Sequence, residues 1–230
     1  MHIIPAAGSA TRMGGIPKYL LPANLNADPI IKFHLQMAHE AELDCIVVTH
    51  PSMTEFVREL IRTWKFSNVH VLPLISKSMT FTILEAIKLF DSKVDVFSIS
   101  MPDTFFEESN GFRSDFLLQL RSCAPSLGLW RIQDSQIGKL GQVKIDFDSK
   151  RVVSMMDKNP YCDFEFSWGM MALNLHTIQA LHEDDAHPGI SFEKLLDLEH
   201  ISYSLATGSY IDCGTPKEYF SFLNRQFAGI

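Results

Sequence analysis

A glycine-containing turn near the N-terminus brings together residue types that bind phosphate groups. The apolar run HIIPA at residues 2–6 predicts a buried strand, and the turn AGSATRMGG follows it directly. Backbone N–H groups in such a turn can approach phosphate oxygens, and Arg12 and Lys18 add two cations. The segment is neither GxxxxGK[ST] nor GxGxxG, because Pro17 and Tyr19 flank the lysine and Ala10 replaces a glycine. The turn therefore predicts a triphosphate site that differs from the two best-known phosphate loops.

Two acidic residues far apart in the sequence are candidates for binding a cation. Asp103 follows an apolar run that predicts a strand, and Asp212 lies in YIDCGTP near the end of the chain. Mg²⁺ needs few protein carboxylates when substrate phosphates supply the other oxygens, so the two could share one ion. Both also have structural interpretations, since Asp103 could cap a helix beginning near Thr104 and Asp212 could precede a helix with Pro216 at its first position.

Alternating strand and helix patterns in the first half of the chain place the N-terminal turn and Asp103 just after predicted strands. Strands are predicted at residues 2–6, 45–49, 69–75 and 94–99, and helices at 30–40, 51–64 and 82–90. This order favours a parallel sheet covered on both faces, with ligands bound beyond the carboxyl ends of its strands. We therefore expect an α/β fold with a doubly wound, mostly parallel, Rossmann-like sheet.

The second half of the chain has a different sequence pattern, with several strand-like segments in succession, and it predicts a mixed sheet. Strand-like segments occur at residues 127–132, 141–147, 151–156 and 168–173, and helices are expected at 178–182, 192–198 and 217–227. We find no linker, internal repeat or low-complexity tract. The sequence therefore predicts a single domain over 1–230, in which 1–110 and 111–230 form two halves.

Composition excludes several classes of protein. The 230 residues are 46% hydrophobic and 20% charged, as in ordinary globular proteins, and the net charge of −7 disfavours a nucleic-acid-binding protein. Four scattered cysteines without a CxxC pair predict reduced thiols in a cytoplasmic protein. A signal peptide, a membrane span and an HExxH zinc site are not expected, because their patterns do not occur.

Five segments, in order, resemble the sugar-1-phosphate nucleotidyltransferase family, which includes the hexose-1-phosphate thymidylyl- and uridylyltransferases. They are IIPAAGSATRM…PKYLLP, MPDTFFE, LGQVKID…VVSMMDKNP, FSWGMMALN and IDCGTPKEYF. The resemblance implies a GT-A-like fold and an Mg²⁺-dependent enzyme that joins a nucleoside triphosphate to a sugar-1-phosphate, releasing pyrophosphate. It favours dTTP or UTP and allows a homo-oligomer. The half 1–110 would then bind the nucleotide and 111–230 the sugar phosphate.

The resemblance also implies a role for each matching residue on the nucleotide side. The catalytic cations would be Arg12 and Lys18, which hold the triphosphate, and the metal carboxylates would be Asp103 and Asp212. The nucleotide-binding residues would be Ala6, Ala7 and Gly8 from the opening turn and Ser78, Thr80 and Thr82 from the loop that contacts the base.

On the sugar-phosphate side, the resemblance implies three binding residues. Lys158 would grip the phosphate of the sugar-1-phosphate as a third catalytic cation, Asp157 would accept a sugar hydroxyl, and the backbone of Gly169 would lie against the sugar ring. The sequence departs from the family at Asp157, where glutamate is usual, at Ala10, and in the base-contacting loop, which lacks Gly-Thr-Ala-Gly. These departures leave the sugar and the base open.

Three alternatives remain to be weighed against this enzyme. A cytidylyltransferase acting on a phosphocholine-like compound shares the opening motif, and Phe164, Phe166 and Trp168 could form a cage for its quaternary ammonium group, although core packing is the simpler interpretation. An inactive regulatory paralogue that binds a nucleotide-sugar is disfavoured, because the cations and both aspartates are all present. An NAD-dependent Rossmann enzyme is disfavoured by the missing glycine.

Overall fold

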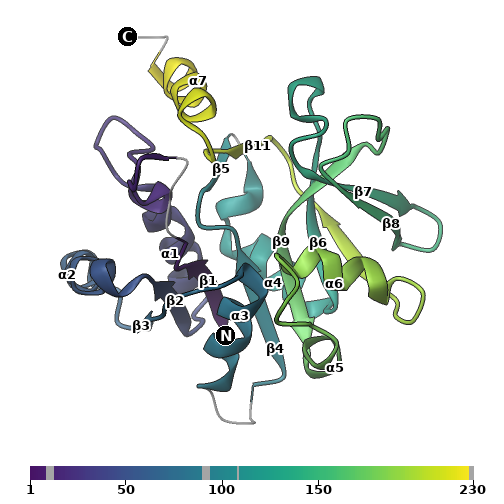
Figure 1. The fold of residues 1–230 in the computed structure, drawn as a ribbon, viewed down its shortest axis with the longest axis horizontal. Coiled ribbons are helices and arrows are strands. Elements are labelled where there is room, and N and C mark those ends of the chain that lie inside the picture. Colours follow the sequence, from purple (N-terminus) through teal and green to yellow (C-terminus); the bar gives the residue numbers. More distant parts are fainter. Residues whose placement is uncertain (9–12, 90–93, 108, 228–230) are drawn as a thin grey trace.

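The computed structural model describes residues 1–8, 13–89, 94–107 and 109–227. Its N-terminal half alternates strands and helices in the expected order (Figure 1). The elements are β1 His2–Ala6, α1 Ile30–Glu40, β2 Cys45–Thr49, α2 Thr54–Trp64, β3 Val69–Pro73, α3 Met79–Lys88 and β4 Val96–Ser100. The bounds of β1, α1 and β2 agree with those predicted, because each apolar run is buried along its length or on one face.

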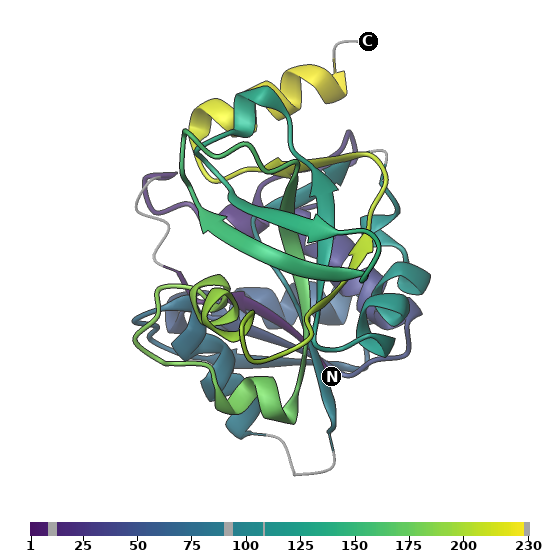
Figure 2. The ribbon, with the colours of Figure 1, turned by 90° about the vertical axis from the view of Figure 1, so that its right-hand side faces the viewer.

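The C-terminal half adds antiparallel strands to the same sheet. Its elements are α4 Ser114–Ser122, β6 Ser126–Arg131, β7 Gly141–Asp146, β8 Arg151–Asp157, β9 Phe166–Asn174, α5 Leu175–Gln179, α6 Pro188–Leu195 and β10 Ser202–Leu205. Within the described residues the sheet has nine strands in the order β10-β6-β9-β4-β1-β2-β3, and β7 and β8 branch from β9. In Figure 2 the β7–β8 hairpin lies across the strands of the central sheet.

Strand directions confirm the predicted fold class. β1 is parallel to β2 and β4, β2 is parallel to β3, and β6 is parallel to β10. β9 is antiparallel to β4, β6 and β7, so the second half of the sheet is mixed. The structure is therefore an α/β fold with a mostly parallel central sheet.

Helices cover both faces of the sheet, as expected for buried parallel strands. Ile3 of β1 packs in one cluster with Ile83 of α3 and Phe192 of α6. The next residue, Ile4, points to the opposite face and packs in a cluster with Leu35 of α1 and with residues of α2. Burying each such side chain contributes about 1.5–3 kcal/mol, so the sheet that ends at the candidate site is held rigidly from both sides.

A separate two-stranded sheet brings the distant aspartates together. β5 Thr104–Glu107 pairs antiparallel with β11 Ser209–Asp212, and Asp212 lies opposite Thr104. Helix α7 Pro216–Phe227 follows β11 (Figure 1). It packs against this pair through Tyr219 and Phe222. The interpretation of Asp103 as the cap of a helix beginning at Thr104 is therefore wrong, because Thr104 begins a strand.

Several boundaries differ from the predictions for local reasons. The helix predicted at 82–90 begins at Met79, because the hydroxyl oxygen of Ser78 accepts a hydrogen bond from the N–H of Phe81 and caps the helix. Its predicted last residue, Phe90, lies outside the described residues. The last helix begins at Pro216, one residue before the predicted range of 217–227, with Thr215 as its cap. Four elements were not predicted: α4, β5, β10 and β11.

Among the described residues, short 3-10 helices occur at Lys18–Leu20, Pro51–Met53, Asn110–Phe112 and Asp134–Gln136. In the described part of the chain, no helix has the length and apolar character needed to cross a membrane.

Candidate functional site

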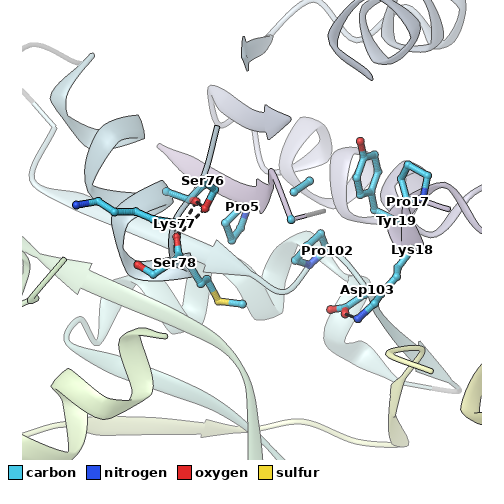
Figure 3. A pocket seen from close by; sticks show the side chains of 13 residues that line it. Pro5, Pro17, Lys18, Tyr19, Ser76, Lys77, Ser78, Pro102 and Asp103 are labelled. Carbon is cyan, nitrogen blue, oxygen red and sulfur yellow. Dashed lines mark hydrogen bonds and ion pairs between the residues drawn. The ribbon is translucent and has the colours of Figure 1, made fainter. Parts of the chain in front are cut away.

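A first pocket of about 390 Å³ opens at the carboxyl end of β1 (Figure 3). Its walls come from four segments of the N-terminal half: the end of β1 with Gly8, the 3-10 turn around Lys18, the start of α3, and the loop after β4. This is where a parallel sheet places its ligands, because the loops that leave the strands converge there. The pocket therefore lies where the sequence predicted a triphosphate site.

The α3 wall of the first pocket is fixed by its own hydrogen bonds. The Ser76 hydroxyl donates to the carbonyl of Ser78 at 2.9 Å, and the Thr82 hydroxyl donates to the same carbonyl at 2.9 Å. The Ser78 hydroxyl donates to the carbonyl of Glu183 at 2.8 Å while it caps α3. Because these side chains are already engaged, the wall is organised without a ligand. Figure 3 shows Lys77 pointing away from the other labelled side chains.

A second pocket of about 360 Å³ adjoins the first. The β7–β8 hairpin supplies one side of it, from Lys139 to Gly141 and at Asp157 and Lys158. Trp168 of β9, His187 before α6 and the β11 segment supply the remaining sides. This pocket therefore contains acidic, cationic and aromatic groups together, a combination suited to a polar anionic molecule with an apolar face.

Lys18, Met79 and Asp103 line both pockets and mark their junction. The Lys18 Nζ lies 3.0 Å from the Asp103 Oδ2, and the side chains are 14% and 26% exposed. Figure 3 shows this pair with Lys18 and Asp103 pointing toward one another. A partly buried ion pair at the junction places a fixed cation and a carboxylate where ligands in the two pockets would meet.

Asp212 lies close enough to Asp103 to feel its charge. The Cys213 N–H donates to the carbonyl of Asp103 at 2.9 Å and joins the two segments. Burial raises the pKa of Asp212, the negative charges of Asp103 and Glu218 raise it further, and Lys18 opposes them. The site therefore holds more negative charge than Lys18 alone balances, which favours binding of a cation.

These two carboxylates fit a magnesium ion that also binds a phosphorylated ligand. Among the described residues, no group of three or more His, Cys, Asp or Glu side chains is arranged to hold a metal. Mg²⁺ is commonly held by one or two carboxylates together with phosphate oxygens, so Asp103 and Asp212 suffice only when a ligand supplies the rest. The hard oxygen donors and the excess negative charge both match this ion.

Buried polar groups beneath β5 hold Asp103 in place. The His34 Nε2 donates to the carbonyl of Thr104 at 2.9 Å, and the Thr104 hydroxyl donates to the Tyr210 hydroxyl at 3.0 Å. Complete burial lowers the pKa of His34 to about 4, partly opposed by the Thr104 hydrogen bond and the charge of Asp103. His34 is therefore neutral at pH 7, which fits a histidine that acts as a hydrogen-bond donor in the core.

The predicted nucleotide residues fall into three groups. Four of them line the first pocket: Ala6, Gly8, Ser78 and Thr82. The other two, Ala7 and Thr80, are buried and line neither of the two pockets. Arg12 lies outside the described residues.

Two of the three predicted sugar-phosphate residues line a pocket and the third does not. Asp157 and Lys158 line the second pocket. Lys158 has a φ of +47°, a left-handed conformation that is uncommon outside glycine and concentrates at functional sites. Gly169 lines neither pocket; a Cβ there would overlap the Tyr210 ring, so this glycine lets Tyr210 pack against β9.

Sequence reasoning missed several pocket residues, His187 above all. His187 lies within hydrogen-bonding range of Asp157 although thirty positions separate them. Tyr19, Met79 and Tyr210 also line the pockets, although none of them was proposed as a site residue. Of the three aromatics proposed as an ammonium cage, Trp168 lines the second pocket and neither Phe164 nor Phe166 does. The structure therefore gives that cage no support.

Solved structures with the same fold cover almost the whole chain. One, assigned as a glucose-1-phosphate thymidylyltransferase from Bacillus anthracis and crystallised with a sucrose, has a TM-score of 0.81 at 12% identity and covers 98% of this chain and 94% of that one. A UDP-glucose pyrophosphorylase complexed with UDP-glucose has a TM-score of 0.78 at 16% identity, covering 100% and 98%. A UTP-bound UGPase from Acinetobacter baumannii has a TM-score of 0.74 at 18% identity, covering 100% and 93%.

These matches define the class of fold. The chain has the Rossmann-like fold seen in these nucleotidyltransferase structures, as the sequence motifs predicted. Neither the scan against family models nor the search of curated proteins gives a match.

Proposed function

We propose that this protein is a sugar-1-phosphate nucleotidyltransferase that joins a nucleoside triphosphate and a sugar-1-phosphate into an NDP-sugar and pyrophosphate. The observation that supports this most is the Lys18–Asp103 pair at the junction of two pockets, with Asp212 beside it. A reaction between two phosphorylated molecules needs two adjoining sites with a charged centre between them. The nucleotide would occupy the first pocket and the sugar phosphate the second.

The division of the chain into halves follows from this assignment. Every residue lining the first pocket belongs to 1–110, and most of those lining the second belong to 111–230. We therefore assign the nucleotide to the parallel half of the fold and the sugar phosphate chiefly to the mixed half, within one domain.

The chemistry needs no general base. A phosphate oxygen of the sugar-1-phosphate is already anionic at neutral pH and attacks the α-phosphorus of the triphosphate in line. One P–O bond forms to the α-phosphorus, the bond between the α-phosphorus and its bridging oxygen breaks, and pyrophosphate leaves with that electron pair. Catalysis is then mainly positioning and charge neutralisation, and the cations of the site are suited to both tasks.

Each charged residue has a task in this step. Lys18 neutralises phosphate charge at the junction of the pockets, and Lys158 orients the attacking phosphate from the hairpin side. Arg12 would meet the departing pyrophosphate. Asp103 and Asp212 would hold Mg²⁺, which when bound supplies positive charge to the phosphate oxygens.

The preference for dTTP or UTP comes from the sequence resemblance. Two of the solved structures with this fold hold uridine nucleotides, UDP-glucose in one and UTP in the other, and a third is assigned to thymidylyl transfer. Each shares under a fifth of its residues with this chain, so the base is a matter for experiment.

A pyrophosphate-release assay tests the proposal directly. Each of dTTP, UTP, CTP, GTP and ATP is combined with glucose-1-phosphate, other hexose-1-phosphates or phosphocholine, with Mg²⁺ or with EDTA. We expect release with a hexose-1-phosphate and dTTP or UTP, abolished by EDTA. Release with CTP and phosphocholine alone would establish the cytidylyltransferase instead. Thermal stabilisation of ~5 °C or more by a nucleotide at 100 times its Kd, without any release, would identify a non-catalytic binding protein.

A further inference from the structure

We propose that His187 is a specificity-determining residue of the second pocket, where it and Asp157 together recognise a hydroxyl group of the sugar. The inference rests on the proposed function of that pocket. It concerns which feature of the second substrate the protein selects, and it assigns this selection to a residue that no sequence motif indicated.

The first support is the geometry of the pair. The His187 Nε2 lies 3.3 Å from the Asp157 Oδ2, and both side chains line the second pocket. His187 is 17% exposed and Asp157 is 41% exposed, so the imidazole is the more buried of the two groups. A carboxylate beside an imidazole offers an acceptor and a donor to the same hydroxyl group.

The second support is an unmet hydrogen bond. The His187 Nδ1 is buried and has no hydrogen-bond partner among the described residues. Leaving a buried polar atom unpaired costs about 1–3 kcal/mol, and an apolar side chain of similar size would avoid this cost. Packing alone therefore does not account for a histidine at this position.

The third support is that the segment carrying His187 is held firmly. The Ser78 hydroxyl donates to the carbonyl of Glu183, and the Met79 N–H donates to the carbonyl of Ala186 at 3.1 Å. On the other side, the Ser191 hydroxyl donates to the Asp185 carboxylate at 2.6 Å. His187 is thus anchored to the start of α3 and to α6, and an anchored side chain discriminates between ligands better than a mobile one.

The fourth support is the aromatic ring beside the pair. The Trp168 ring centroid lies 6.0 Å from that of His187. A Cβ at Gly189 would lie 2.8 Å from the Trp168 Cζ2, and one at Gly141 would overlap the Trp168 Nε1, so two glycines make room for this ring. An aromatic ring next to a carboxylate and an imidazole fits a ligand with an apolar C–H face and hydroxyl edges, as in a pyranose. Lys158, in the same pocket, fits its phosphate.

The test compares glucose-1-phosphate with analogues that each lack one hydroxyl group. Values of kcat/KM are measured for glucose-1-phosphate and its monodeoxy analogues at saturating nucleotide, in the wild-type protein and in His187→Leu. We expect one deoxy analogue to be at least ~100-fold poorer for the wild type, because a polar site left unpaired rejects the analogue. His187→Leu should reduce this discrimination at least ~10-fold and leave the KM of the nucleotide unchanged.

Two further variants serve as a matched control and as a second test of the inference. His182→Leu is the matched control, because His182 lies in the same segment, is exposed and lines neither pocket, and it should keep the wild-type discrimination. Asp157→Asn changes the exposed partner of the pair and should weaken the same selection even if His187→Leu fails to fold.

The outcomes separate this inference from the proposed function. If the wild type is active and either His187→Leu or Asp157→Asn keeps full discrimination against every deoxy analogue, the inference is wrong and the proposed function stands. If the wild type releases no pyrophosphate with any pair of substrates, the proposed function is wrong. In that case, calorimetric binding of glucose-1-phosphate decides the inference: at least ~10-fold weaker binding to His187→Leu supports it, and equal or absent binding overturns it.

Discussion

The two pockets that meet at Lys18 and Asp103 are built by different parts of the fold in different ways. The first is formed by the ends of parallel strands and the start of a capped helix, whose hydrogen bonds are already made. The second is formed by a hairpin and by loop side chains, including Asp157 and His187, that come together from distant parts of the chain. The first pocket therefore owes its shape to backbone and core, and the second owes its chemistry to individual side chains.

This difference indicates which pocket can change its ligand specificity more readily. A pocket shaped by buried strands resists alteration, because moving its walls disturbs the core. A pocket shaped by side chains can exchange one ligand for another through a few substitutions. We therefore expect nucleotide binding to tolerate little variation, and recognition of the second substrate to depend on a small number of replaceable residues.

The largest expected effect comes from the residue that both pockets share. Lys18→Met removes the cation at the junction and keeps most of the side-chain length. Turnover should fall by ~10²–10³-fold, the scale for losing one preorganised electrostatic group. The kcat and both KM values are measured by pyrophosphate release. If only one substrate's KM changed, with kcat intact, the two pockets would not share this residue in the reaction.

Lys32→Met is the matched control for that experiment. Lys32 also forms a partly buried ion pair, with Asp28 at 2.6 Å, but it lines neither pocket. Turnover of this variant should remain within about twofold of the wild type, because Lys32 lies outside both pockets and its partly exposed pair contributes only ~0–1 kcal/mol to stability.

The next effect tests the buried support beneath β5. The pKa of His34 is about 4 in the folded protein, below the ordinary value of 6.5, because of burial. As the pH falls from 6.5 to 4, the unfolded chain therefore takes up a proton that the folded chain does not. The stability from neutral His34 is present above pH 6.5 and is lost across this window, by about 3 kcal/mol.

Urea unfolding at pH 7 and pH 4.5 measures this loss. His34→Gln keeps a donor toward the Thr104 carbonyl and cannot titrate, so its stability should fall less between the two pH values. His39→Gln, at an exposed position of the same helix, should behave like the wild type. Equal acid losses in His34→Gln and the wild type would show that His34 titrates normally.

The smallest expected effect is a change in the second pocket that leaves nucleotide binding in the first pocket unaltered. Gly141→Ala would push Trp168 out of place, because the added Cβ overlaps its indole nitrogen. We expect the KM of the second substrate to rise ~10-fold, about 1.4 kcal/mol, with the KM of the nucleotide unchanged. Gly189→Ala presses on the same ring from another side and should have the same selective effect. A comparable rise in both KM values would mean that the pockets do not act separately.

The parallel half of the fold could be predicted because its strands are continuous apolar runs. The run CIVVT is buried at all five positions, and the predicted strand has the observed bounds, Cys45–Thr49. The Gly8 turn, Lys18 and Asp103 then follow from the rule that ligands lie at the carboxyl ends of such strands. The position of the first pocket was therefore accessible from the sequence.

Pairing between distant segments could not be predicted from local patterns. The strand Thr104–Glu107 has four residues, and its partner Ser209–Asp212 lies about a hundred positions away. Neither forms a periodic run long enough to be recognised. The convergence of Asp103 and Asp212 was expected from the chemistry of Mg²⁺ binding and from the resemblance, and the contact of His187 with Asp157 was not expected at all. Both depend on tertiary contacts.

The central claim is that Asp103 and Asp212 serve one shared ion at the reacting centre. A double-mutant cycle on turnover tests it most directly, using Asp103→Asn, Asp212→Asn and the two together at saturating substrates and Mg²⁺. We predict that each single change lowers kcat at least ~100-fold and that the double variant is about as slow as the slower single variant, because residues acting as a unit are not additive. Losses that multiply in the double variant, or near-normal turnover in either single variant, would contradict the account.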